Sequence, residues 1–161
     1  MKANFSRRGR CLSVQAIAFH EAGHAVVGTI YRLTVERASI IADPESHGRV
    51  WFSDASWVAS PLDVLVAMHL AGQEAQNHAA TIYPVPLMSY DYWDLIWVRT
   101  MLAQQLGVDD WHSNIVDTAI ERARMHVSSA VYHQWAWIER VALALMVRKS
   151  LTGTEIWEMR Q

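Results

Sequence analysis

This sequence of 161 residues is poor in several features that would each indicate a class of protein. Its one cysteine, Cys11, cannot form an internal disulfide, so a disulfide-stapled secreted fold is excluded. No run approaches the 18 or so uninterrupted apolar residues of a membrane-spanning helix. No glycine-rich loop ending in Lys-Ser or Lys-Thr occurs, so no ATP site is visible. We therefore expect a cytoplasmic chain with no membrane span.

Charge of one sign is also lacking, because 14 basic and 16 acidic side chains leave a formal net charge of -2. General nucleic-acid binding needs a basic surface, so we expect no nucleic-acid partner. The one basic cluster is RRGR at residues 7–10, and no apolar run of signal-peptide length follows it. We expect residues 1–12 to form a flexible basic tail and residues 13–161 a single domain, for which 52% hydrophobic residues suffice.

The most informative stretch is residues 18–28, which contain His-Glu-x-x-His. Residues four apart share a helix face, so His20 and His24 would present two imidazoles to one metal ion. Zinc is the usual metal, because it accepts neutral imidazole and leaves a position open for water. Glu21 would be the general base, since it can take a proton from that water. Gly23 and Gly28 inside this helix predict the close approach of another backbone.

The remaining pattern predicts a mainly α fold with a small β-strand pair. Ser113 or Asn114 begins a long helical pattern, kinked or divided near Ser128 and Ser129, and Thr152 with Glu155 has capping-box spacing for a short last helix. The other expected helices cover residues 14–31, 60–79 and 89–106, and the expected strands cover 34–41 and 48–53.

Three further histidines have simpler explanations than metal binding. His47 lies in the predicted loop between the strands, and His69 and His78 follow the helical pattern after Pro61. We expect a loop residue at position 47 and core or surface residues at positions 69 and 78.

Several segments together resemble the peptidase domain of the FtsH-type membrane AAA+ zinc proteases. HEAGHA at residues 20–25 is the specific match. Weaker matches follow in the family's order: the strand pair, LAGQEAQ at 70–76, SYD at 89–91 opening a helix that ends at Gly107, and LTGTEI at 151–156. The resemblance covers roughly residues 13 to 160 and implies a helical zinc-peptidase domain without the ATPase module.

The resemblance also implies a third zinc ligand, an aspartate on the helix that ends at Gly107. Counting back from Gly107 without a gap places it at Asp91, whereas Asp94 would require a shift of three residues. We favour Asp91, so His20, His24 and Asp91 would bind zinc. Where the family has glutamate in the segment 70–76, this chain has Gln76, which puts the support of the zinc site in doubt. Glu74 is nearby but lies on a different helix face.

The resemblance implies a zinc-dependent endopeptidase acting on unfolded or flexible polypeptides, independent of ATP in itself. An extended peptide would add to the strand pair. The alternative is a zinc-binding interaction module that keeps the peptidase fold with weak or no activity. The intact Glu21 favours the enzyme. The sequence leaves open whether the chain forms a homo-oligomer or works with a separate ATPase.

Overall fold

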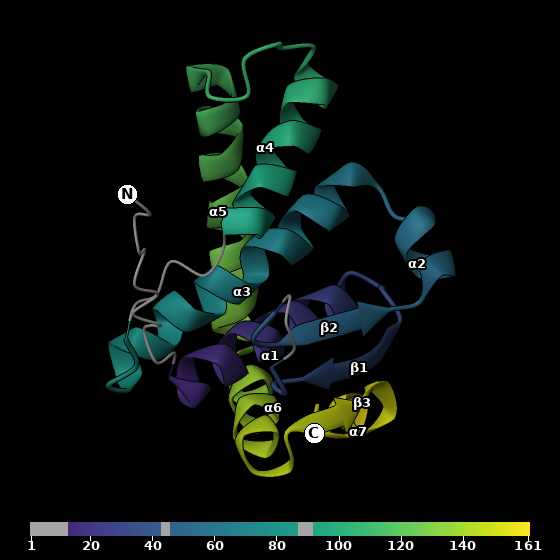
Figure 1. Ribbon diagram of the computed structural model, residues 1–161, viewed down its shortest axis with the longest axis vertical. Helices are drawn as coiled ribbons and strands as arrows, with labels where there is room; N and C mark the ends of the chain where they lie inside the picture. Colours follow the sequence, from purple (N-terminus) through teal and green to yellow (C-terminus); the bar gives the residue numbers. More distant parts are fainter. Residues whose placement is uncertain (1–12, 43–45, 87–91) are drawn as a thin grey trace, which may run out of the picture.

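The computed structural model describes residues 13–42, 46–86 and 92–161, with the backbone alone at residues 92 and 93. The chain is mainly helical, with one small antiparallel sheet, as the sequence predicted (Figure 1). The predicted tail at residues 1–12 lies outside the described residues. The elements in chain order are α1 (Val14–Ile30), β1 (Val35–Ser39), β2 (Arg49–Phe52), α2 (Asp54–Val58), α3 (Leu62–Ile82), α4 (Tyr92–Leu106), α5 (Asn114–His133), α6 (Trp135–Arg148), β3 (Ser150–Thr152) and α7 (Gly153–Glu158).

Helix α1 is the centre of the core. Every residue from Ala16 to Gly28 is buried, which is the expected state of a helix that is apolar nearly all round. It packs against α3 on one side, α6 on another and strand β1 on a third. A Cβ atom at Gly23 would lie 2.5 Å from the Cβ of Ala75 and 2.6 Å from the carbonyl oxygen of Ala71. The close backbone approach predicted from this glycine is therefore confirmed, and it fixes where α1 and α3 cross.

The sheet has three strands in the order β2-β1-β3, all antiparallel. Strands β1 and β2 are the predicted pair, joined in a register that places Ala38 opposite Val50. Strand β3 was not predicted. Its three residues are too short to show an alternating pattern, but they pair with β1 and bury Leu151. The capping box between Thr152 and Glu155 begins α7 as predicted.

The long C-terminal helical pattern is divided at Gln134 instead of near Ser128 and Ser129, as the sequence had suggested. Ser128 continues α5 without a break, and its hydroxyl donates to Glu74 of α3. The chain changes direction at Gln134 because α5 packs against α3, whereas α6 packs against α1. The division follows from packing partners that lie far away in the sequence.

Helices α4 and α5 form an antiparallel pair that extends away from α1, with α3 packed beneath both (Figure 1). Helix α4 ends as predicted at Gly107, whose positive φ of 64° is accessible to glycine without strain. Among the described residues, no helix has both the length and the apolar character needed to cross a membrane.

Candidate metal centre and active site

Two elements bring the candidate metal ligands together. His20 and His24 lie one turn apart on α1, and Asp94 lies in the first turn of α4. One donor atom from each of these three residues falls within 4.8 Å of the other two. The two histidines are buried, and the aspartate side chain is 28% exposed. The expectation that His20 and His24 share a helix face is confirmed.

The spacing of these donors suits a small tetrahedral metal. Ligand atoms 2.0–2.1 Å from zinc lie about 3.3 Å apart in a tetrahedral site. The Nε2 atoms of His20 and His24 are separated by 2.9 Å, and the Oδ2 atom of Asp94 lies 3.9 Å and 3.6 Å from them, respectively. These distances bracket the required value, and two imidazoles with one carboxylate are a donor set that zinc accepts.

The rings of both histidines are held by groups on α3. The carbonyl oxygen of Met68 can only accept, so Nδ1 of His24 donates to it, at 2.7 Å, and Nε2 is left facing the other ligands. His20 interacts with the fully buried side chain of Gln76, whose amide also donates to the carbonyl oxygen of Pro86. Such partners orient metal-binding imidazoles. Gln76 therefore contacts the site, and glutamine can provide the support that the sequence had placed in doubt.

Gly72 on α3 has no side chain and so leaves room for the two imidazole rings. A Cβ atom at Gly72 would lie 2.4 Å from Nε2 of His24 and 2.6 Å from Nε2 of His20. Real Cβ atoms essentially never approach other atoms so closely. Gly72 is thus required where α3 passes directly over the nitrogens that would bind a metal.

The electrostatics of the cluster favour the charged form of His24 and the neutral form of His20. Burial, together with the neighbouring charge of His24, lowers the pKa of His20 to about 3. Burial also opposes charge on His24, but the hydrogen bond and negative charge of Asp94 outweigh it and raise the pKa of His24 to about 9. Burial likewise disfavours the Asp94 carboxylate, yet hydrogen bonds from His24 and His69 hold its pKa below the usual range. Near pH 7 the cluster therefore holds a carboxylate, one imidazolium and one neutral imidazole.

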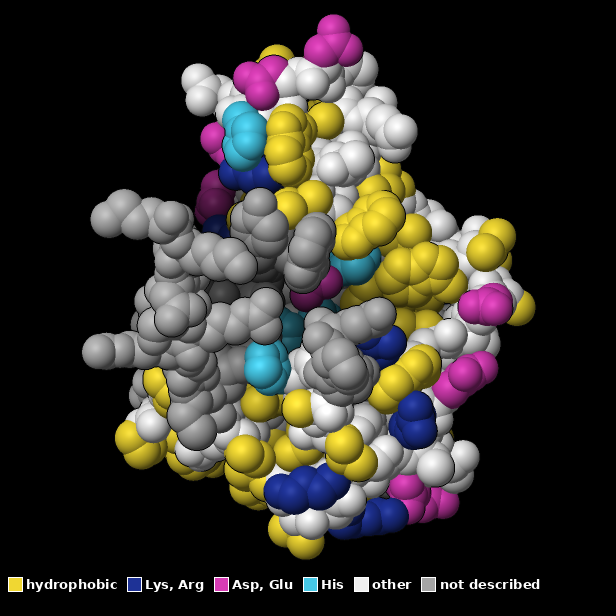
Figure 2. All heavy atoms as spheres, viewed as in Figure 1, with side chains coloured by type: hydrophobic (Ala, Val, Ile, Leu, Met, Phe, Trp, Pro, Cys, Tyr) yellow, Lys and Arg dark blue, Asp and Glu magenta, His cyan; other side chains and the backbone are white. Residues whose placement is uncertain are grey.

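Glu21 borders the same open space as the ligands. Its side chain is buried, and a Cβ atom at Gly48 would lie 2.6 Å from its Oε1 atom. The loop before β2 thus passes directly against this carboxylate. Glu21, His20, His24 and Asp94 all line one cavity of about 440 Å³. Figure 2 shows histidine and acidic side chains within a hollow on the face of the molecule.

The cavity wall is mixed in character. Apolar side chains come from β2, α2 and α3, namely Val50, Phe52, Trp57 and Met68. Polar and basic groups come from the loop before β2, from the first residue of β2 and from α3, namely Ser46, His47, Arg49 and His69. The hollow therefore presents both hydrogen-bonding groups and apolar surface beside the three candidate ligands.

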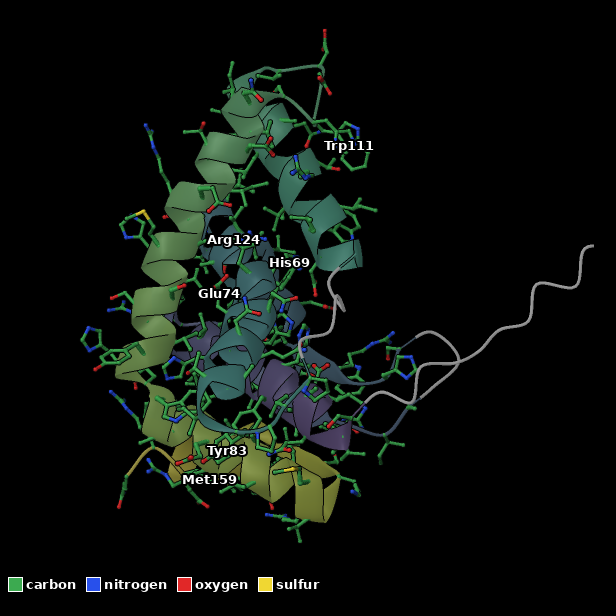
Figure 3. The ribbon with its side chains drawn as sticks, turned by 90° about the vertical axis from the view of Figure 1, so that its left-hand side faces the viewer. His69, Glu74, Tyr83, Trp111, Arg124 and Met159 are labelled. Carbon is green, nitrogen blue, oxygen red and sulfur yellow. The ribbon has the colours of Figure 1, made fainter. Side chains whose placement is uncertain are left out.

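The structure tests the remaining sequence predictions unequally. Asp91 lies outside the described residues, so its assignment as third ligand stays a prediction. Asp94, the alternative in the sequence, is the aspartate placed beside the histidines. His47 is a loop residue, as expected. Glu74 points away from the site and contacts Ser128 and Arg124 of α5 (Figure 3).

His69 is the site residue that the sequence did not identify, since it was expected to be a core or surface residue. Its Nδ1 atom lies 2.7 Å from Oδ1 of Asp94. The same helix carries His78, which instead packs against the rings of Tyr132 and Trp135. The three-residue interval between His69 and Gly72 puts both on one helix face, which is the signal that could have separated His69 from His78.

Comparisons of the sequence with protein-family models and with curated proteins gave no match.

Proposed function

We propose that this protein is a zinc-dependent endopeptidase, with a catalytic domain like that of the FtsH-type proteases. The observation that carries the proposal is the convergence of His20, His24 and Asp94 with Glu21 at one open cavity. A scaffold has no chemical need for a carboxylate beside three such donors. A metal hydrolase needs one as its base.

His20, His24 and Asp94 would hold the zinc ion in this proposal. When bound, zinc supplies a Lewis acid that polarises a carbonyl and makes water more acidic. Met68 and Gln76 keep the two imidazoles in place, so the donor geometry is prepared before the metal arrives. Asp94 takes the role that the sequence had assigned to Asp91, because it is the aspartate that lies beside the two histidines among the described residues.

Glu21 performs the proton transfers. It follows His20 on α1 and borders the cavity, so its carboxylate can accept a proton from the attacking water. The same proton can then pass to the leaving amine as the peptide bond breaks. Burial of Glu21 limits its contact with bulk water, which keeps this transfer within the site.

The substrate would be an extended polypeptide. Strand β2 stands at the end of the strand order β2-β1-β3, which is where an extended peptide would add to the sheet. Arg49, Val50 and Phe52 of β2 also line the cavity. A peptide that adds to this edge would run past the metal ligands, and a folded chain could not do so without opening. The expected substrates are therefore unfolded or flexible polypeptides, cleaved without ATP.

The test combines metal content with peptide cleavage on the same preparations. We expect about one zinc per wild-type chain and cleavage of a denatured protein such as casein. Glu21→Gln should keep the zinc, because no ligand changes, and lose activity by about 10²–10⁴-fold, the usual contribution of a positioned acid-base group. Glu158→Gln, an exposed glutamate on α7, is the matched control and should behave as wild type.

Two results would contradict the proposal. Equal turnover by Glu21→Gln and wild type would remove Glu21 as the base. A wild-type protein that binds zinc but cleaves neither casein nor a peptide library would favour the zinc-binding interaction module instead.

A further inference from the structure

The two carboxylate oxygens of Asp94 face different partners. Oδ2 lies 3.6 Å from Nε2 of His24 and 3.9 Å from Nε2 of His20. Oδ1 lies 2.7 Å from Nδ1 of His69. An ionised carboxylate can only accept hydrogen bonds, so Nδ1 of His69 carries the proton and donates it. Oδ2 thus faces the two histidines, whereas Oδ1 accepts the hydrogen bond from His69.

His69 is itself held in position. Its side chain is 13% exposed, and the ring of Trp57 on α2 packs edge-on against it, with centroids 5.7 Å apart. Its neighbour in the chain, Met68, provides the carbonyl oxygen that binds His24. Two consecutive residues on a single turn of α3 therefore hold one ligand from α1 and one from α4.

We propose that His69 is a positioning residue for the metal centre, which keeps Asp94 as a single-oxygen ligand by binding its second oxygen. The inference rests on the proposed function, because it concerns the same three ligands. A carboxylate freed from His69 could turn both oxygens towards the metal and occupy the position needed by water. It could also turn towards solvent and leave the metal with two ligands.

The test compares His69→Phe with His69→Asn. Phenylalanine preserves a flat ring of similar size but cannot donate to Asp94. Asparagine carries its amide nitrogen on Cγ, as histidine carries Nδ1, so it can still donate. The same change at His78→Phe is the matched control, because His78 lies on α3 but packs against Trp135.

Two measurements, made on folded protein with metal alone, report on this role. Zinc affinity, from competition with a coloured chelator, should fall about 10- to 100-fold in His69→Phe, as is usual when an outer partner of a ligand is lost. The absorption of bound Co²⁺ reports coordination number, because four-coordinate sites absorb more strongly than five-coordinate ones. We expect an altered cobalt spectrum in His69→Phe, a nearly wild-type one in His69→Asn, and no change in His78→Phe.

The possible results separate this inference from the proposed function. If His69→Phe binds zinc with the wild-type affinity and gives the wild-type cobalt spectrum, the inference is overturned and the proposed function is not. Loss of zinc from His69→Phe as complete as from Asp94→Ala would also overturn it, since His69 would then be a ligand. A wild-type protein that takes up no zinc would overturn both. If His69→Phe does not fold, His69→Leu replaces it, because leucine is smaller and equally unable to donate.

Discussion

Two clusters of polar side chains lie against different faces of helix α3, and they differ in how their groups are paired. Towards α5, Glu74 accepts from the Ser128 hydroxyl at 2.5 Å and lies 3.9 Å from Arg124, so an acid meets a hydroxyl donor and a base. Towards α1 and α4, the Nε2 atoms of two buried imidazoles face each other at 2.9 Å beside a carboxylate. In the first cluster the carboxylate meets a hydrogen-bond donor and a positive charge directly. The second brings three metal-binding donor atoms within 4.8 Å of one another, an arrangement that a single cation bound among them would complete.

This difference accords with the proposed metal site at the α1 cluster and with a structural role for the contacts between α3 and α5. Strongly shifted pKa values occur together in the α1 cluster, where His20 is lowered to about 3 and His24 is raised to about 9. Such perturbed groups in a cavity are typical of functional sites, although ion pairs within a fold can also produce them. Substitutions in the α1 cluster should therefore affect metal binding, and substitutions in the Glu74 cluster should affect the stability of the fold.

The largest effect is expected from removal of the third ligand. Asp94→Ala should weaken zinc binding by more than about 100-fold, beyond the loss expected for an outer partner, because a charged ligand is removed. Asp91→Ala is the direct comparison, since the sequence favoured Asp91 and the structure places Asp94 beside the histidines. Chelator competition measures both. Loss of zinc from Asp91→Ala with retention in Asp94→Ala would return the assignment to Asp91.

The next effect concerns the space over the two rings. Gly72→Ala would place a methyl group 2.4 Å from Nε2 of His24, so the rings must separate or α3 must shift. We expect zinc affinity to fall at least tenfold while the far-ultraviolet circular dichroism stays helical, since alanine is the better helix former by about 1 kcal/mol. Gln73→Ala, at the adjacent position, is the control because its side chain binds Asn77. Undiminished zinc binding by Gly72→Ala would show that this close approach is unimportant.

A third prediction is that zinc affinity depends on pH, because His24 carries a proton that zinc must displace. Because the pKa of His24 is about 9 and the metal needs neutral imidazole, zinc must displace about one proton near pH 7. Apparent zinc affinity should rise about tenfold per pH unit from pH 6.5 to 8.5 and level off above 9. Calorimetry in buffers of different ionisation enthalpy counts the protons. Zinc affinity that is flat over this range would exclude a charged His24.

The same proton makes the stability of the metal-free protein depend on pH. The folded pKa of His24, about 9, exceeds its unfolded value of about 6.5. Its contribution is therefore complete below pH 6.5 and is lost as the pH rises to 9. The folded pKa of His20, about 3, is below its unfolded value, so stability also falls as the pH drops from 6.5. Thermal melts of chelator-treated protein should give a maximum near pH 6.5, and saturating zinc should remove the loss on the alkaline side.

The smallest effect on the metal is expected from the other face of α3. Glu74→Ala removes the partner of Ser128 and Arg124, and should lower the free energy of unfolding by about 1–2 kcal/mol. Zinc affinity should stay within about twofold of wild type, because Glu74 does not face the ligands. Urea unfolding measures the first quantity and chelator competition the second. A tenfold loss of zinc affinity here would show that the two clusters are coupled.

Sequence reasoning reached the parts of the site that depend on one helix. The spacing of His20 and His24 within α1 requires only helix geometry, so that part of the prediction was accessible and is confirmed. The position of Asp94 depends on how α4 docks on α3, which no local pattern encodes. His69 was missed for the same reason, because its partner lies 25 residues further along the chain.

The fold shows a similar limit. Elements with clear local signals were found: the helical spacing of α1, the β-formers flanking a turn in the β1–β2 pair and the capping box of α7. Strand β3 and helix α2, of three and five residues, have too few positions to show a period. The division between α5 and α6 was predicted in the wrong place. It lies at Gln134 because the two helices have different packing partners, whereas the serine residues inside α5 gave a misleading local signal.

The burial of α1 from Ala16 to Gly28 also has a consequence for how fast a bound metal ion could leave. Helix α1 is enclosed by α3, α6 and β1, so its amides should exchange with solvent only through the largest unfolding events. Helix α4 packs against α3 and α5 and lies towards the outside, so it should open more often and at lower free energy. The three ligands thus belong to regions with different opening rates. Dissociation of the ion would follow the transient detachment of α4, and hydrogen exchange in α4 should slow in step with metal occupancy, whereas exchange in α1 should report the stability of the whole domain.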